Sequence, residues 1–531
     1  MRTLVLVAVL LGLLVGPHGP ARAEDGVASA LAALSSRHYD DIAGGVAALA
    51  VSGDRRAAAI LGALQGGHLY ARADHALFIR RADDTYVDAA TGAPAADPGT
   101  LRQVRLNNAV RRALEAGLSA LRLFAPDTSV RATAADTLFA SRDTAAIPAL
   151  DRALARETDP GVKTRMQQAR AAAILQKPDA TEADRLAAVA TVRARGGLEA
   201  RSLLEGLSGQ PPSVSRAAAA AVSALDFDLR LWNYAQSAWY GLSLGSVLLL
   251  AATGLAITFG VMGVINMAHG EMVMLGAYAT YVVQLVFRAH VPPGLYGLSI
   301  PVAIPVAFVV AGIVGIAIER LMIRFLYGRP LETLLATFGL SLILQQAVRT
   351  IFGPTNRDVD TPAWMSGATQ IGGLQVTFNR LYIILFAVGV LFALMAVLRR
   401  TPLGLQMRAV TQNRRMAAAM GIRTPWVDAL TFGLGSGVAG MAGVALSQID
   451  NVSPNLGQGY IIDSFMVVVF GGVGNLWGTA VGAVVLGVIN KFLEPVAGAV
   501  LGKIVVLVLL ILFIQRRPRG MFPLKGRAAE A

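Results

Sequence analysis

Residues 238–262 read AWYGLSLGSVLLLAATGLAITFGVM, a run of apolar residues without a charged side chain. About 20 apolar residues in a helix are enough to cross the hydrocarbon core of a bilayer. Similar runs follow at 268–287, 298–318, 331–352, 381–398, 426–449, a broken pair at 461–474 and 477–490, and 496–514. The sequence therefore predicts an all-α, polytopic membrane helix bundle of about eight spans, including the broken pair, in a domain over 238–525.

The composition is uneven along the chain. Charged residues make up 15% of the 531 residues, against about a quarter in soluble proteins. Residues 24–230 are nevertheless rich in Ala, Arg and Asp, which is typical of a domain in water. The net charge of +13 lies largely beside the apolar runs, so it indicates membrane topology rather than nucleic-acid binding. Cysteine is absent, which excludes disulfides and thiolate metal sites, and no residue set resembles a metal cluster.

The first residues have the pattern of a secretory signal. Arg2 precedes the apolar run Leu4–Val15, helix breakers follow it, and Ala21-Arg22-Ala23 offers a small-x-small cleavage site. The run is too short for a membrane span, which is the alternative interpretation. We therefore predict a signal peptide over 1–23 and a periplasmic domain over 24–230.

The periplasmic domain is predicted to be mostly helical, with a small extended patch. Residues 69–72, 76–80 and 85–88 alternate in polarity or carry β-forming residues between turns. A turn, a valine, a basic residue and an apolar helix then recur three times. The turns begin at Asp127, Asp159 and Pro211, and the helices are expected to end near Ala140, Leu175 and Leu225. This pattern resembles HEAT-type repeats, with a generic helical domain as the alternative because the spacing is irregular.

The basic loops predict the orientation of the membrane domain. The segment 399–425 contains six Arg and no acid, and the segment 319–330 and the tail after Ile514 are also basic. Such loops stay on the cytoplasmic side. Counting spans from an external residue 230 places all three inside, which agrees with the signal peptide and predicts a cytoplasmic C-terminus.

The segment 404–422 lies between two spans and is predicted to form an amphipathic helix that ends at Gly421. Residues 417–419 are three alanines, which offer a smooth face to a soluble partner in the helix-in-groove mode. The alternative interpretation is a basic loop that only obeys the positive-inside rule.

Four ordered stretches carry a resemblance to a known family: Asn266–Glu271 (NMAHGE), 404–422, Phe470–Ala480 (FGGVGNLWGTA) and Arg516–Gly520 (RRPRG). They are similar to permease subunits of the branched-chain amino acid and urea ABC importer family, over about 238–525. The exported domain before the permease resembles the longer permease of the urea importer. The resemblance therefore implies a permease subunit that transports urea, with branched-chain amino acids as the alternative solutes.

The resemblance also implies partners. The chain has no phosphate-binding loop, since Gly498–Ile504 has the wrong spacing, so it is not expected to be an enzyme or to hold a cofactor. Two cytoplasmic ATPase subunits would dock on 404–422, a homologous second permease would complete the pore, and a periplasmic substrate-binding protein would deliver the solute. The expected coupling residues are Arg408, Ala409, Asn413, Ala417, Ala418 and Gly421.

Polar residues inside apolar spans are candidates for the solute pathway, because they are costly in lipid. Asn266, His269 and Glu271 lie at the first helix break and Asn475 at the second. Ser341, Gln345 and Gln346 are expected to line one helix face. Amide side chains supply the donors and acceptors that urea needs. As alternatives, His269 and Glu271 cap a helix and Asn475 satisfies a turn. We expect surface positions for Asp450, Asp463, Lys491 and Glu494.

Two other classes of protein fit less well. A membrane receptor would need a cytoplasmic signalling domain, and only a short segment follows the last apolar run. A channel would leave the segment 404–422 without a purpose.

Overall fold

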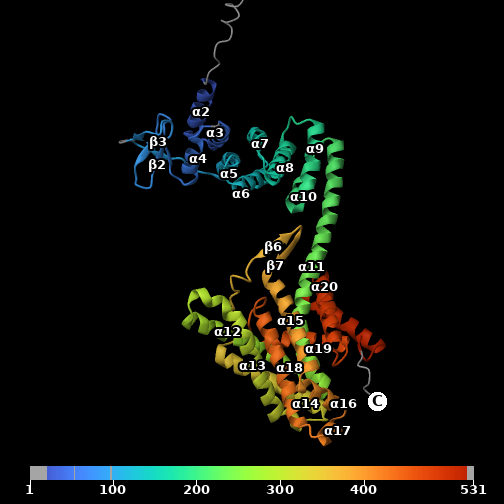
Figure 1. The fold of residues 1–531 in the computed structure, drawn as a ribbon. Helices are drawn as coiled ribbons and strands as arrows, with labels where there is room; N and C mark the ends of the chain where they lie inside the picture. Colours follow the sequence, from blue (N-terminus) through green and yellow to red (C-terminus); the bar gives the residue numbers. More distant parts are fainter. Residues whose placement is uncertain (1–20, 53, 96–98, 208, 523–531) are drawn as a thin grey trace, which may run out of the picture. The chain divides into compact units, whose positions relative to one another are not determined.

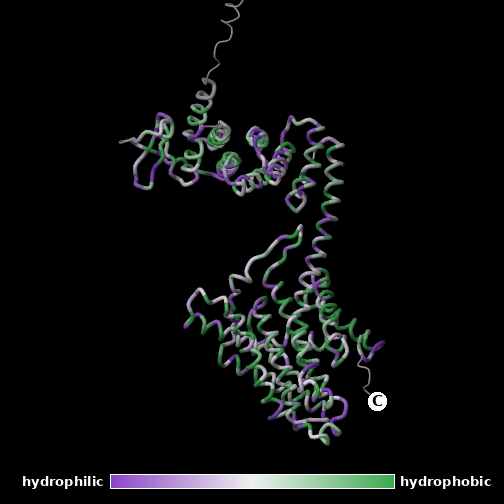
Figure 2. Tube along the Cα trace, viewed as in Figure 1, coloured by the Kyte–Doolittle hydropathy of each residue, from purple (hydrophilic) through white to green (hydrophobic). Residues whose placement is uncertain are grey.

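The computed structural model describes residues 21–52, 54–95, 99–207 and 209–522. Within them the chain divides after Leu229 into two compact units, each with its own core (Figure 1). Most of the predicted signal peptide lies outside the described residues. Figure 2 shows hydrophilic residues throughout the first unit, whereas hydrophobic residues predominate in the second. The predicted helical membrane bundle is confirmed.

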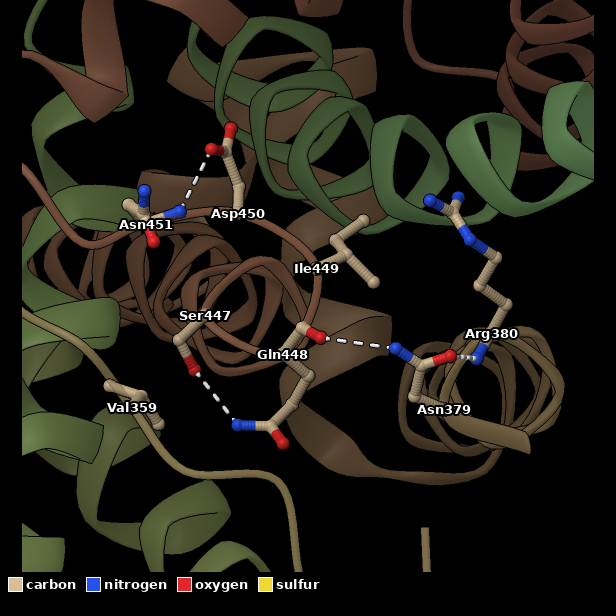
Figure 3. Close-up of a pocket in the computed structure, with 8 residues that line it drawn as sticks. All are labelled: Val359, Asn379, Arg380, Ser447, Gln448, Ile449, Asp450 and Asn451. Carbon is tan, nitrogen blue, oxygen red and sulfur yellow. Dashed lines mark hydrogen bonds between the residues drawn. The ribbon is translucent and has the colours of Figure 1, made fainter. Parts of the chain in front are cut away.

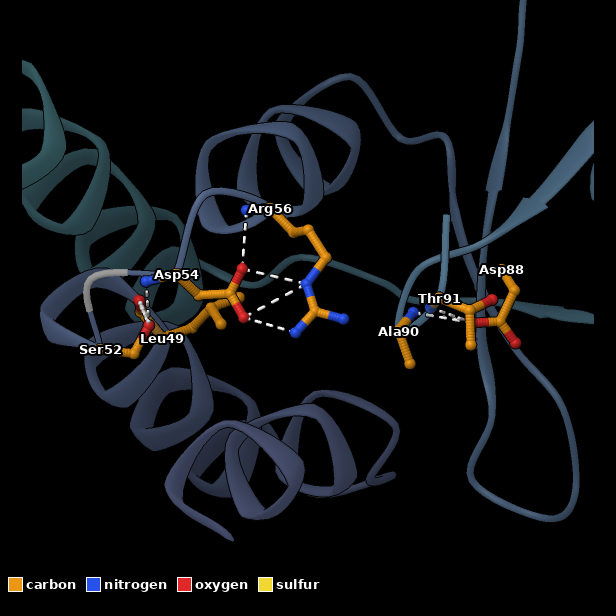
Figure 4. Close-up of polar contacts among 7 residues, drawn as sticks. All are labelled: Leu49, Ser52, Asp54, Arg56, Asp88, Ala90 and Thr91. Atoms are coloured by element: carbon orange, nitrogen blue, oxygen red, sulfur yellow. Dashed lines mark hydrogen bonds and ion pairs between the residues drawn. The ribbon is translucent and has the colours of Figure 1, made fainter. Parts of the chain in front are cut away.

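The first unit begins with three helices and a small sheet. Helices α2 (Ala21–Leu34), α3 (Tyr39–Val51) and α4 (Ala57–Gln65) are followed by β1 (Leu69–Ala71), β2 (Leu77–Arg80), β3 (Tyr86–Asp88), β4 (Pro94–Ala95) and β5 (Arg102–Gln103). The strands are antiparallel in the order β4-β3-β2-β1-β5. The predicted extended patch is therefore confirmed. Figure 4 shows one turn of the patch, after β3, where Asp88 accepts from the backbone N–H groups of Ala90 and Thr91.

The rest of this unit is helical. It contains α5 (Asn108–Arg122), α6 (Thr128–Ser141), the 3₁₀ turn η1 (Thr144–Ala146), α7 (Ile147–Leu154), α8 (Pro160–Gln176), α9 (Glu182–Arg195), α10 (Gly197–Glu205) and the start of α11 (Pro212–Met262). Asp127 and Asp159 cap α6 and α8 through the backbone N–H groups of Ser129 and Val162, as their turn positions suggested. One predicted end is wrong: α11 continues past Leu225 and ends at Met262.

The second unit contains α12 (His269–His290), η2 (Pro293–Leu298), α13 (Ser299–Leu321), η3 (Ile323–Phe325), α14 (Pro330–Phe352), the hairpin β6 (Ala368–Ile371) and β7 (Leu374–Thr377), α15 (Phe378–Arg400), α16 (Pro402–Gln412), α17 (Arg414–Ala419), α18 (Thr424–Leu446), α19 (Leu456–Gly471) and α20 (Leu476–Arg516). In the described part of the chain, seven helices are long and apolar enough to cross a membrane.

The predicted break between 461–474 and 477–490 is present, but the helix after the break does not end near residue 490 as expected. Gly472 and Gly474, both with positive φ, separate α19 from α20. A gap was expected between residues 490 and 496, yet α20 passes through it with Pro495 inside. The chain bends instead at Gly498, which has a φ of 77°. Proline lacks the N–H for a hydrogen bond one turn back, but the bend itself needs the positive φ that only glycine adopts easily.

Small residues bring α12, α13 and α18 close together. A Cβ on Gly276 would lie 2.0 Å from the Gly440 carbonyl oxygen, and one on Gly443 would lie 2.0 Å from the Val273 carbonyl oxygen. Gly437 packs in the same way on Phe308 of α13. Helices in lipid gain little from hydrophobicity when they associate, so such close backbone contacts hold them together. α18 is consequently the central helix of this group.

Candidate functional site

The break between α11 and α12 is fixed by hydrogen bonds to its own turn and to α14. Asn266 is fully buried, and its Oδ1 accepts from the backbone N–H of Ala268 at 3.0 Å. The backbone N–H of Met267 donates to Thr337 Oγ1 on α14 at 3.1 Å. Asn266 Nδ2 has no hydrogen-bond partner among the described residues. Asn266 therefore shapes the turn and keeps an unused NH₂ group with two N–H donors.

A buried polar cluster joins the first turn of α12 to α14. Glu271 Oε1 accepts hydrogen bonds from Ser341 Oγ and Gln345 Nε2, both at 2.8 Å, and Gln345 Nε2 lies 3.2 Å from Ser341 Oγ. All three residues are buried, with exposed fractions of 4% or less. Glu271 Oε2 has no partner in the described part of the chain. The structure thus brings together three of the predicted pathway residues and leaves a buried acceptor on one of them.

His269 points away from this cluster, toward α11. Its Nε2 is 3.0 Å from the Ala251 carbonyl oxygen, and a Cβ on Gly254 would lie 3.0 Å from its Cε1. The ring is 1% exposed, and Nδ1 has no partner among the described residues. His269 therefore packs between helices, in space that Gly254 leaves free.

Two other predicted residues are not in the cluster. Gln346 is exposed on α14, next in sequence to buried Gln345, because neighbouring helical residues point about 100° apart. Asn475 caps α20: its Oδ1 accepts from the N–H groups of Trp477 and Gly478, and its Nδ2 donates to the Phe522 carbonyl oxygen at 3.1 Å. The geometry of Asn475 matches the alternative interpretation, a structural asparagine.

The segment 404–422 forms two short helices, α16 and α17, rather than the single helix that was expected. Asn413 separates them, and its Oδ1 caps α17 by accepting from Met416 N at 3.0 Å. Gly421 has a φ of 87° and ends the segment, as predicted. Arg408 is exposed and donates to the Leu398 carbonyl oxygen, while Ala409 is half-buried.

Contrary to the prediction, the three alanines 417–419 do not form one exposed face. Ala417 is 5% exposed and packs inside the unit against residues such as Val427 and Val438. Ala418 and Ala419 are exposed, and next to them Met416 and Met420 are 61% and 79% exposed. The exposed surface at α17 is therefore formed by Met416, Ala418, Ala419 and Met420, because Ala417 is used for internal packing.

Two ion pairs were missed by the sequence reasoning. Arg414, at the start of α17, pairs with Asp428 of α18, and its guanidinium lies over the Tyr327 ring at 4.5 Å. Lys503 of α20 pairs at 2.9 Å with Asp463 of α19, which is 4% exposed and not at the surface as expected. A lone acid within an apolar run was the available signal, since such a charge needs a partner.

Comparisons with known proteins agree with this architecture. A family model described as "Branched-chain amino acid transport system / permease component" matches residues 237–514. The high-affinity branched-chain amino acid transport system permease protein BraD of Pseudomonas aeruginosa is 31% identical over 301 residues, which cover 55% of this chain and 96% of that protein. The corresponding permease LivH of Salmonella typhimurium is 30% identical over 297 residues, 54% of this chain and 95% of that protein.

More distant similarity extends to the ribose import permease protein RbsC of Bacillus subtilis, 29% identical over 108 residues, 19% of this chain and 34% of that protein. No solved structure matches the chain. The family match covers more than half of the chain and includes the helix break before α12, the short helices α16 and α17, and the break before α20. On this evidence the chain belongs to the family of branched-chain amino acid transport permeases, the membrane-spanning components of ABC importers.

Proposed function

We propose that this permease carries a small neutral amide, urea, across the inner membrane. The observation that supports this most is the buried cluster of Glu271, Ser341 and Gln345, which has a free carboxylate oxygen. A buried acceptor without a partner costs about 1–3 kcal/mol, so a passing N–H group is favoured there. The resemblance of the exported domain to the longer urea permease supports the same solute.

Branched-chain amino acids are the second candidate, because the names of the relatives assign that substrate class to them. The two solutes differ in charge at the group that would meet Glu271. Urea offers a neutral N–H, whereas an amino acid offers an ammonium group that pairs with the carboxylate. The carboxylate strengthens a hydrogen bond to either donor, and the positive charge of the ammonium group adds an ion pair to it.

The variant Glu271→Gln separates these candidates. Glutamine keeps a carbonyl oxygen as acceptor but removes the charge. If the solute is neutral, its hydrogen bond is kept but the acceptor loses its charge. Uptake per folded permease should then fall by about 5- to 13-fold, which corresponds to about 1–1.5 kcal/mol, the difference between a hydrogen bond to a charged and to a neutral group. Labelled urea and labelled leucine are measured in cells with the full importer, and Gln346→Ala controls for the loss of a polar side chain on the exposed face of α14. Uptake of leucine but not urea by the wild type would overturn the urea assignment.

Family membership implies an ATPase and a substrate-binding protein as partners. We infer that two ATPase subunits dock on α16 and α17, that a homologous second permease completes the pore, and that α16 and α17 are cytoplasmic. The adjacent alanines of α17 provide a matched test. Ala418→Asp adds a charge to the exposed face and should abolish co-purification of the ATPase while the permease still folds.

In contrast, Ala417→Asp places the charge in the internal packing and should lower the amount of folded permease itself. Normal uptake by Ala418→Asp would show that 404–422 is only a basic loop and not a docking segment. In the same orientation, residues 24–230 are periplasmic and the C-terminus is cytoplasmic.

A further inference from the structure

A polar hollow of about 320 Å³ lies where α15 begins and just beyond the end of α18 (Figure 3). Pockets that bind small molecules start at roughly 300 Å³, so this hollow suits a small solute. Its lining is almost entirely polar and consists of Val359, Asn379, Arg380, Ser447, Gln448, Ile449, Asp450 and Asn451. It is separate from the cluster around Glu271, with which it shares no residue.

Amide groups form the floor of the hollow. Asn379 Nδ2 donates to the Gln448 carbonyl oxygen at 3.3 Å, and Gln448 Nε2 donates to Ser447 Oγ at 3.4 Å (Figure 3). Gln448 is 6% exposed, and its Oε1 has no hydrogen-bond partner among the described residues. Because an unsatisfied buried oxygen is unfavourable, an N–H donor that enters the hollow is expected to bind this atom.

The two charged residues of the lining are already engaged. The Arg380 guanidinium lies over the Tyr240 ring at 4.7 Å and donates to Ser243 Oγ at 3.3 Å. Asp450 accepts from the Asn451 N–H at 2.8 Å and from Tyr460 Oη at 3.4 Å. Figure 3 shows Asp450 and Arg380 at different edges of the hollow, with their charged ends apart. Away from these two edges, the hollow offers the neutral groups Gln448 Oε1 and Asn379 Nδ2, an acceptor and a donor that suit an amide solute.

The position of the hollow follows from the helices that border it. α15 begins at the hollow and leads into α16, while α18 follows α17 and ends at the hollow. Each has 23 residues, or about 34 Å of helix, against a hydrocarbon core of about 30 Å. The hollow and the short helices therefore lie at opposite ends of the same two spans. If ATPase subunits dock on α16 and α17, the hollow opens on the outer side.

We propose that this hollow is an outer receiving subsite, where a small neutral amide such as urea binds before it reaches Glu271. The inference rests on the proposed function, because it takes the solute and the docking side from it. Gln448 Oε1 accepts an N–H group of the solute. Asn379 Nδ2, which uses one of its two N–H groups on the Gln448 backbone carbonyl, has the second as a donor for the solute's carbonyl oxygen. The hollow thereby adds a binding step at the outer mouth.

The first test is uptake of labelled urea, at limiting concentration, by cells with the full importer. Gln448→Leu and Asn379→Ala should each lower the rate per folded permease by about 2- to 13-fold, the equivalent of one neutral hydrogen bond. Gln370→Leu, on the exposed strand β6, makes the same type of change outside the hollow and should leave the rate unchanged. Wild-type urea uptake with unchanged rates in both hollow variants would refute the subsite and leave the proposed function intact.

A second measurement does not depend on the folding of these variants. The chain has no cysteine, so Asn451→Cys introduces a single thiol at the rim of the hollow. Urea should slow its reaction with a membrane-impermeant maleimide in intact cells, whereas a non-transported sugar should not. Equal labelling with and without urea would overturn the subsite. Absence of urea uptake by the wild type would instead refute the proposed function, and the subsite with it.

Discussion

The ion pair between Arg414 and Asp428 should respond very differently to the loss of one partner or the other. Arg414 begins α17, the short helix with the exposed methionines, and Asp428 is the fifth residue of α18. The Asp428 side chain is 3% exposed, whereas that of Arg414 is 39% exposed. Removing the arginine strands a buried carboxylate, but removing the carboxylate leaves an arginine that reaches water. We therefore expect Arg414→Gln to be the more damaging change.

The magnitude follows from these two environments. Breaking a buried ion pair by removing one partner costs about 3–5 kcal/mol, which is the expectation for Arg414→Gln. For Asp428→Asn the loss is that of one hydrogen bond to a charged group, about 1.5–3 kcal/mol. The double variant joins two neutral amides at the same place and should be close to Asp428→Asn alone. In a double-mutant cycle, the two substitutions together should therefore destabilise the permease less than the sum of their separate effects.

Thermal inactivation of the purified permease measures this order, with the fraction that stays monodisperse after heating as the readout. Arg414→Gln should also displace α17 and weaken ATPase co-purification, while Arg415→Gln, at an exposed position next to it, controls for the loss of a positive charge. Equal stability of Arg414→Gln and the wild type, or a larger loss in Asp428→Asn, would show that the buried carboxylate does not depend on this arginine.

Three further expectations concern other parts of the chain. Gly443→Leu should prevent packing of α12 against α18 and abolish folded permease, because a Cβ there would lie 2.0 Å from a backbone oxygen. Gly389 has open space around it, so Gly389→Leu should be tolerated. The yield of folded permease distinguishes the two variants. In the first unit, Arg131 holds the pKa of Glu157 below its usual value. The ion pair therefore stabilises the fold fully above the unfolded-state pKa of about 4.3. This stabilisation is lost as the pH falls through the lower pKa that Glu157 has in the folded state. Hydrogen exchange of α6 in Glu157→Gln should therefore be faster than wild type at pH 7, and the difference should shrink as the pH is lowered below 4; equal rates at pH 7 would contradict this. A cysteine at Gln412 should react with an impermeant reagent only after the cells are opened, and reaction in intact cells would reverse the proposed topology.

The sequence was most informative where local chemistry decides the structure. Runs of apolar residues set the membrane helices, and Asp127 and Asp159 mark helix starts because a carboxylate before a first turn satisfies its free N–H groups. The cluster of Glu271, Ser341 and Gln345 was also accessible, since residues 341 and 345 are one helical turn apart. What linked them to Glu271, the packing of α14 against α12, could not be derived from the sequence.

The failures share a physical reason: they depend on contacts between distant segments. Gln346 is as polar as Gln345, and only the orientation of α14 makes one buried and the other exposed. Ala417 and Ala418 are chemically identical, and the packing of α17 on the spans separates them. Asp463 was expected at the surface because its partner, Lys503, is 40 residues away in the sequence. Such pairings require the tertiary structure.

One helix connects the separate sites described above, which gives the coupling a physical basis. α18 carries Asp428 at the end next to α17 and is followed at its other end by Gln448 in the polar hollow. Between these ends, Gly440 and Gly443 press against α12, the helix that carries Glu271. At backbone contacts this close, one helix cannot shift without displacing the other, because close-packed interiors transmit strain. If an ATPase docks on α17 and the solute passes the hollow and Glu271, as we propose, a movement of α17 would reach both places through α18.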